Sequence, residues 1–266
     1  MNTQGKGFIR DPQGHRWTPF KAVHRHGLKA AAPRPRPVHF AAPVSNQLSV
    51  GQCVAHGLLD AAFCALRAFG VAIETPFSHR IGYLVARAVD RAAWVSMGAT
   101  LPPLTDDGCE PNQLARAFPL YGVPLAKDVD GGTLDAIPGL ENRELMLSEA
   151  IASKPGAWPV DFSHVGDNDG DKLAQCEAAI VSGLPFALAI EAGPKFQACD
   201  GSTVLSSDGL MLDHMIHCLD VASDINGRRW LVQNSWGEGW GAFGRAWVDD
   251  GFIEAAGNIL IPRVTA

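Results

Sequence analysis

Three polar residues, far apart in the chain, have the types and the order of a cysteine nucleophile site: Cys53, His214 and Asn234. A thiol becomes an effective nucleophile when an imidazole accepts its proton, and a third polar group commonly orients that imidazole. Gln47 precedes Cys53 by six residues, and a long apolar stretch follows it. These residues indicate thiol-based acyl transfer.

The apolar stretch at residues 54–69 is predicted to be the helix that positions Cys53. Ala, Leu and Phe dominate it, no proline interrupts it, and apolar residues occupy nearly every face, which is typical of a buried helix. Cys53 then lies at or near the helix N-terminus, where unpaired N–H groups and the helix dipole favour an anion. We therefore expect the thiolate form to be favoured.

The remaining pattern changes from helical to extended along the chain. Pro111 at the start and Gly122 past the end support one of the later helices. Helices before strands predict an α+β chain with two segregated lobes. Helices are predicted at residues 78–97, 111–121 and 172–181, and strands at 184–190, 215–221, 229–234 and 244–248.

Composition limits the class of protein. With 266 residues, 47% of them hydrophobic, the chain can bury a large core in one domain or two lobes. No stretch has the ~18 continuous apolar residues of a membrane span, so no membrane partner is predicted. Residues 1–16 show no apolar signal segment, and the six cysteines form no CxxC pair. We expect reduced thiols, although one or two bridges are compatible with the sequence, and a cytoplasmic or other reducing location reached without a signal peptide.

Charge is divided between a basic arm and an acidic body. Residues 1–45 are rich in proline and carry eight Lys or Arg and one acid, a net charge of +7, which leaves −13 on the rest. The acidic body argues against a nucleic-acid partner. The arm has two interpretations: it docks on its own acidic body, or it contacts an acidic partner. A disordered tail is the further alternative.

Two motifs suggest metals only weakly. The run DNDGD at residues 167–171 resembles a calcium loop, but its glycine is at the wrong position and residue 178 is not an acid, so Asp169 or Asp171 is better explained as a helix cap. Neither His24 with His26 nor His214 with His217 has a second cluster of zinc-ligand spacing, and His214 and His217 would face opposite sides of a strand. No metal or cofactor is predicted.

Taken together, three motifs resemble those of the papain-like cysteine peptidases, the peptidase C1 superfamily. They are QLSVGQCVA at residues 47–55, DHMI at 213–216 and NSWGEGWG at 234–241. In the family the corresponding patterns are QGxxGxCxA, a His preceded by Asp or Gly, and NSWGxxWG. The segments DDGCE at 106–110, YGV at 121–123 and FIRDP at 8–12 are similar to those of bacterial members.

The resemblance implies a two-lobe α+β architecture with the active-site cleft between the lobes. It predicts a helical lobe at residues 46–125, a β-barrel-like antiparallel lobe at 126–266, and the arm at 1–45 in place of a helical prodomain. The chain departs from the family at three positions. Val50 replaces a bridging cysteine, Val54 replaces a tryptophan, and His56 replaces an aromatic residue. His56 is either a second neighbour of the thiol or, as we favour, a core or surface residue.

The resemblance also implies a role for each site residue. Cys53 attacks the carbonyl, while His214 accepts the thiol proton and later protonates the leaving amine. Asn234 orients His214, and the Gln47 amide with the Cys53 backbone N–H forms the oxyanion hole. Trp236 covers the His–Asn bond. Substrate-binding positions implied in addition are Gly51, Gln52, Leu212, Asp213, Met215 and Trp236.

The predicted function is a cysteine endopeptidase acting on protein or peptide substrates. Two alternatives stay open on the sequence. One is a catalytically silent papain-like module that binds or supports a larger assembly. The other is a different thiol acyl transfer, such as the cleavage of cell-wall amides or transpeptidation.

Overall fold

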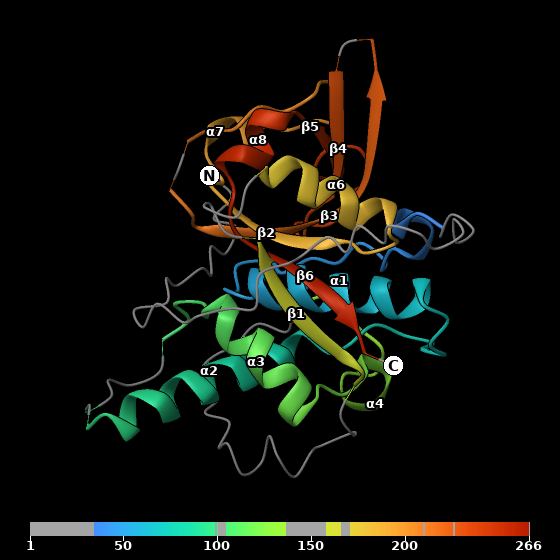
Figure 1. Cartoon of the computed structure of the whole chain (residues 1–266). Coiled ribbons are helices and arrows are strands. Elements are labelled where there is room, and N and C mark those ends of the chain that lie inside the picture. Colours follow the sequence, from blue (N-terminus) through green and yellow to red (C-terminus); the bar gives the residue numbers. More distant parts are fainter. Residues whose placement is uncertain are drawn as a thin grey trace.

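Helix α1 (Cys53–Ala68) lies at the centre of the molecule, between helices α2 (His79–Ser96) and α3 (Pro111–Tyr121) on one side and strand β3 (His214–Asp224) on the other (Figure 1). Its residues 53–66 are all buried, which confirms the predicted buried helix. The computed structural model describes residues 35–98, 100, 105–136, 158–165, 171–209, 211–225 and 227–265.

The strands form one antiparallel sheet in the order β1-β6-β2-β3-β4-β5. Helices therefore precede most of the sheet, and the predicted α+β class is confirmed. Strands β1 and β6 were not predicted, because polar residues interrupt the first and Pro262 stands inside the second. The strands besides β3 are β1 (Val160–Val165), β2 (Phe186–Ile190), β4 (Gly227–Gln233), β5 (Arg245–Val248) and β6 (Gly257–Val264).

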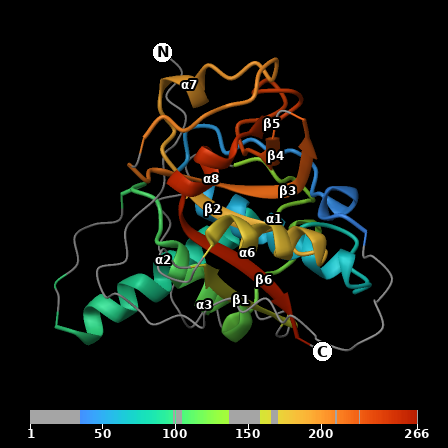
Figure 2. The ribbon, with the colours of Figure 1, turned by 45° about the horizontal axis from the view of Figure 1, so that its top comes forward.

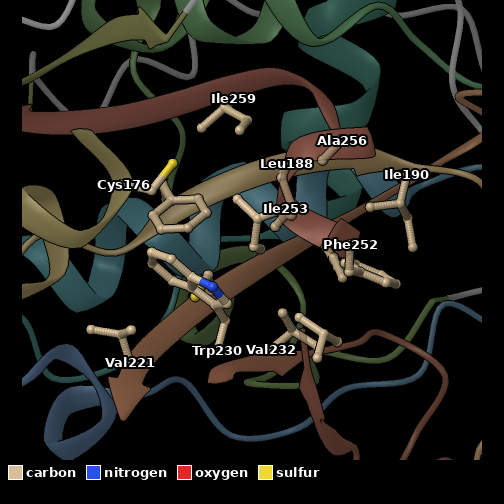
Figure 3. Close-up of a cluster of buried hydrophobic side chains, with 14 of the residues drawn as sticks. Cys176, Leu188, Ile190, Val221, Trp230, Val232, Phe252, Ile253, Ala256 and Ile259 are labelled. Carbon is tan, nitrogen blue, oxygen red and sulfur yellow. The ribbon is translucent and has the colours of Figure 1, made fainter. Parts of the chain in front are cut away.

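Both faces of the middle of the sheet are covered. All five residues of β2 are buried, as expected for a strand with helices on both sides. Helix α1 covers one face, and α6 (Lys172–Val181) with α8 (Asp250–Ala255) lies over the other (Figure 2). On the latter side Trp230 and Phe252 pack with Cys176 and Leu188 in a dry apolar cluster (Figure 3).

Side-chain caps explain where several helices begin. Ser78 caps α2, the Glu110 carboxylate caps α3, and Asp171 caps α6, each by accepting the backbone N–H of the third residue of its helix. Pro111 and Gly122 bound α3 as predicted, and of the two predicted caps of α6, Asp169 and Asp171, it is Asp171 that caps the helix. Shorter elements are η1 (Pro37–Phe40), α4 (Ala126–Val129) and α7 (Pro194–Gln197).

Residues 35–45, the last part of the predicted arm, dock on the body. Arg36 forms an ion pair of 3.1 Å with Asp220, and the Gln233 side chain donates a hydrogen bond of 3.1 Å to the Ala42 carbonyl. These residues lie against the body, whereas docking of the basic arm as a whole stays a prediction.

Several predictions concern residues outside the described ones. These are the arm up to residue 34 with its FIRDP segment and its His24 and His26, and residues 167–170 of the acidic run. The division into lobes at residues 45 and 125 stays a prediction. Among the described helices, none is both long enough and apolar enough to cross a bilayer.

Candidate active site

Cys53 is the first residue of α1, and the turn before it is tightly held. The Gly51 N–H points at the Asp106 carboxylate, with distances of 3.0 and 3.2 Å to its two oxygens. Asp106 in turn accepts a hydrogen bond of 2.6 Å from the Tyr83 hydroxyl. Burial and this bond raise the pKa of Tyr83, so its hydroxyl stays protonated and keeps donating. A Cβ on Gly51 would lie 2.9 Å from the Gly108 nitrogen, so only glycine fits this turn.

Gln47 is buried, and both ends of its amide are fixed. Its Nε2 donates to the Val50 carbonyl at 2.9 Å, and its Oε1 accepts from the Ser235 hydroxyl at 2.5 Å. The backbone N–H of Gln47 also donates to the Ser235 carbonyl at 2.8 Å. Ser235 therefore sets which way the amide points.

His214 and Asn234 form the predicted pair. His214 begins β3, Asn234 follows β4, and His214 Nε2 lies 2.8 Å from Asn234 Oδ1. Because an amide oxygen can only accept, Nε2 must carry the hydrogen in this bond. Nδ1 is then the ring atom able to exchange a proton with a nucleophile. The Ser235 backbone N–H also donates to Asn234 Oδ1, at 2.8 Å, which fixes the amide.

Aromatic rings cover this pair. The Trp236 ring centroid lies 4.8 Å from that of His214, and the Phe196 ring lies 5.8 Å from His214 on an edge. Trp240 packs against Phe196 at 4.7 Å, and its indole N–H donates to the Phe196 carbonyl at 2.7 Å. The rings exclude water from the His214–Asn234 bond, which strengthens it.

Close packing of α1 on β3 brings the two halves of the site together. Gly57, one helical turn after Cys53, lies against Met215, the residue after His214. A Cβ on Gly57 would lie 3.0 Å from Met215 Cγ and 3.2 Å from the Ile216 carbonyl oxygen. The start of α1 and the start of β3 are thus neighbours. Cys53 and His214 are both fully buried in this structure.

The predicted substrate-binding residues fall in different surroundings. Leu212 and Asp213 flank His214 and stay partly exposed, while Asp213 Oδ1 accepts from the Ala192 N–H at 2.8 Å. Met215 is buried on the opposite face of β3, against α1. Gln52 is also buried, and Gly51 and Trp236 lie in the turn and in the aromatic cover already described. Their roles toward a substrate stay predictions.

His56 and His217 occupy the core. His56 Nδ1 lies 2.7 Å from the Ser45 hydroxyl, which confirms core placement over surface placement. Burial lowers the pKa of His56 well below its usual value and that of His217 to about 4. His214 and His217 lie on opposite faces of β3, as predicted. His214 contacts Phe196 and Trp236, whereas His217 interacts electrostatically with Asp60 on α1.

Sequence reasoning missed three residues of the site. Ser235 orients Gln47, Asp106 holds the turn at Gly51, and Phe196 packs on His214. Ser235 lies in the motif NSWGEGWG and Asp106 in the segment DDGCE, so the sequence offered a signal for both residues. No pattern marks Phe196, because it reaches His214 only through the fold.

Known proteins share sequence and fold with this chain. Residues 151–257 match the model of the papain family cysteine proteases. Fruit bromelain of Ananas comosus is 30% identical over 102 residues, which is 38% of this chain and 28% of bromelain's length. The chain thus spans well under half of that relative.

Solved structures extend the likeness to the whole fold. A digestive procathepsin L2 of Tenebrio molitor has a TM-score of 0.68 at 18% identity, covering all of this chain and 79% of its own. Xylellain, a cysteine protease of Xylella fastidiosa, has a TM-score of 0.65 at 16% identity, covering all of this chain and 98% of its own. Such low identities carry the fold alone. The chain therefore has a papain-like fold, and its residues 151–257 are similar in sequence to the papain family cysteine proteases.

Proposed function

We propose that this chain is a thiol-dependent endopeptidase that hydrolyses peptide bonds through an acyl-enzyme on Cys53. The observation that carries the proposal is the His214–Asn234 bond of 2.8 Å under Trp236. That bond fixes the hydrogen on Nε2 and commits Nδ1 to proton exchange. The helix that begins with Cys53 packs against the strand that begins with His214.

The proposed reaction uses these groups in turn. His214 Nδ1 accepts the proton of Cys53, and the thiolate sulfur attacks the peptide carbonyl carbon. The Cys53 N–H and the Gln47 amide N–H stabilise the oxyanion. The imidazolium gives its proton to the leaving amine, and an acyl-thioester remains on Cys53. Water, deprotonated by His214, then releases the carboxylic acid and restores the thiol.

Substrate contact is proposed along Gly51, Gln52 and the partly exposed Leu212 and Asp213. Asp213 is held by its hydrogen bond to the Ala192 N–H, which gives a fixed wall beside His214. A protein or peptide in extended conformation suits such a site because papain-family relatives are proteases.

We propose further a bacterial- or phage-type member that works in a reducing compartment. The DDG and YGV segments at residues 106–108 and 121–123 support the type. None of the six cysteines, all of them within the described part, forms a disulfide. Residues 35–45 run as an extended chain with one short 3-10 helix.

Hydrolysis of an unfolded, fluorescently labelled protein tests the main proposal. Wild type should release peptides, and both Cys53→Ala and His214→Gln should abolish the release while circular dichroism shows an unchanged fold. If wild type and Cys53→Ala behave identically, the chain is a silent binding module. If neither cleaves protein but wild type lyses cell walls, the thiol serves amide cleavage there.

A further inference from the structure

A second cluster of reactive side chains lies inside the fold, on the helix that begins with Cys53. His56 and Asp60 are one turn apart on α1, and His79 is the first residue of α2. One ring nitrogen of each histidine and one carboxylate oxygen of Asp60 lie within 4.8 Å of one another. All three residues are at least 98% buried. Three ligand-type groups are thus gathered where water does not reach.

The Nδ1 atom of each histidine ring has a hydrogen-bond partner outside the cluster. His79 Nδ1 lies 3.0 Å from the Leu134 carbonyl oxygen, and His56 Nδ1 lies 2.7 Å from the Ser45 hydroxyl. In both rings Nε2 is therefore the nitrogen left for the cluster. This is how metal-binding histidines are commonly oriented, with the second nitrogen bonded to a carbonyl or hydroxyl.

The Nε2 atoms have unequal partners. His79 Nε2 lies 2.8 Å from Asp60 Oδ1, whereas His56 Nε2 is buried with no hydrogen-bond partner among the described residues. The His56 ring lies over the His79 ring, with centroids 3.9 Å apart. A buried ring nitrogen without a partner costs free energy, and the cost is removed if that atom ligates an ion.

His217 is a further buried histidine beside α1. It lies on the face of β3 that α1 covers, and its Nε2 is also buried without a hydrogen-bond partner among the described residues. The ligand atoms gathered within 4.8 Å of one another nevertheless come from His56, Asp60 and His79.

We propose that His56, Asp60 and His79 bind a divalent metal ion of the zinc class. Two imidazoles and one carboxylate form a ligand set that zinc accepts. Zinc bonds of about 2.0–2.1 Å in a tetrahedron place ligand atoms about 3.4 Å apart. The His79–Asp60 pair at 2.8 Å needs to open by only about 0.6 Å, with the ion replacing the shared proton.

The ion would tie together α1 and α2. None of the six cysteines, all within the described part, cross-links these two helices by a disulfide. Complete burial of the three ligands describes a structural site rather than one open to substrate. The inference does not depend on peptidase activity.

Metal titration of the full chain tests the site. Because Cys53 and His214 could themselves bind zinc, the titration uses the Cys53→Ala background, with a chromophoric chelator as competitor. One Zn²⁺ per chain should bind, and Co²⁺ in its place should show the strong visible absorption of tetrahedral coordination. His56→Gln and Asp60→Asn should each weaken zinc binding by about 100-fold or more.

Two control variants locate the binding. His39→Gln changes an exposed histidine outside the cluster and should leave zinc affinity unchanged. The double variant His24→Gln/His26→Gln should also retain it. Binding that disappears in the arm variant and persists in His56→Gln and Asp60→Asn would overturn the proposal.

Thermal melting keeps the test valid if a cluster variant folds poorly. For the Cys53→Ala chain, zinc at about 100 times its Kd should raise Tm by roughly 5 °C, and excess chelator should reverse the shift. No bound zinc after dialysis together with no shift in Tm would mean that the cluster is only a buried His79–Asp60 ion pair.

Discussion

The two faces of the central sheet bury different kinds of side chain. The face under α6 and α8 is dry and apolar (Figure 3), with Leu188, Trp230, Val232, Phe252 and Ile253 among its members. The face under α1 buries polar groups among its apolar ones, including His56, Asp60, His79 and His217. Burying imidazoles and a carboxylate costs free energy that apolar residues would not.

This difference indicates that the two sides of the sheet have different roles. Apolar packing on the α6 and α8 side stabilises the fold, whereas the α1 side is less stable because it holds polar groups in fixed positions. The proposed catalytic residues lie where the sides meet. Cys53 begins α1 on the polar side, whereas the His214 ring packs on Phe196 and Trp236, which belong to the dry cluster.

The largest expected effect is a loss of stability on the dry face. Trp230→Ala should lower the free energy of unfolding by about 3–5 kcal/mol, because it empties a fully buried site and removes the indole hydrogen bond of 2.7 Å to Asp250. Urea denaturation measures the loss. Trp247→Ala, on the neighbouring strand and only partly buried, is the matched control and should cost much less. Equal losses of unfolding free energy in the two variants would contradict the stabilising role of the apolar face.

The next effect is on catalysis, from the polar side. Gln47→Ala should lower kcat/KM by about 10²–10³, or roughly 2.7–4 kcal/mol, since it removes one proposed oxyanion donor. Ser235→Ala leaves that donor present but less well oriented, so its loss should be smaller, about tenfold. Gln175→Ala, on α6, should leave activity unchanged. A Ser235→Ala loss larger than that of Gln47→Ala would contradict the positioning role.

A smaller effect tests how closely α1 lies on β3. Gly57→Val should lower the free energy of unfolding by about 1–3 kcal/mol, because the new side chain would overlap Met215 and the Ile216 carbonyl. Gly251→Ala, at an exposed position of α8, is the control and should be nearly neutral. Chemical denaturation compares the two, and a neutral Gly57→Val would show that α1 packs loosely.

The smallest effect is a pH-dependent one at the edge of the dry side. Hydrogen bonds from Arg228 and then from Trp230 hold the pKa of Asp250 below its usual value. A lowered pKa means that the carboxylate stabilises the fold above the unfolded pKa and loses this contribution as pH falls through the folded value. Asp250→Asn should therefore cost up to about 1 kcal/mol at pH 7, since the pair is partly exposed. The cost should shrink below pH ~4, and a constant difference in Tm from pH 7 to 3 would contradict it.

Local chemistry made much of the fold predictable. The bounds of α3 and the start of α6 follow from Pro111, Gly122 and Asp171, because caps and stops act over a few residues. The start of α1 at Cys53 was expected to within one residue. Strands β1 and β6 were missed because their pairing partners lie far away in the sequence and their own pattern is weak.

The two polar clusters also differ in whether the local sequence marks them. Cys53, His214 and Asn234 could be named because each lies in a motif of its own. The spacing of His56 and Asp60 was visible in the sequence, but His79 joins them only when α2 packs on α1, so no local pattern marks the cluster. Contacts made by tertiary packing carry no such signal.

The reactivity of the six native thiols tests the central claim most directly. Burial raises the pKa of Cys64 and Cys176 to about 12, and the pKa values of Cys109 and Cys218 are raised well above the usual one, so these thiols should be inert near neutral pH. Cys199 is partly exposed and its pKa is also raised, mainly by burial. A thiol-directed epoxide inhibitor of papain-like enzymes, followed by peptide mapping, should label Cys53 stoichiometrically. His214→Gln should abolish the labelling. Labelling of Cys53 no faster than that of Cys199, or unaffected by His214→Gln, would show that Cys53 is not an activated nucleophile.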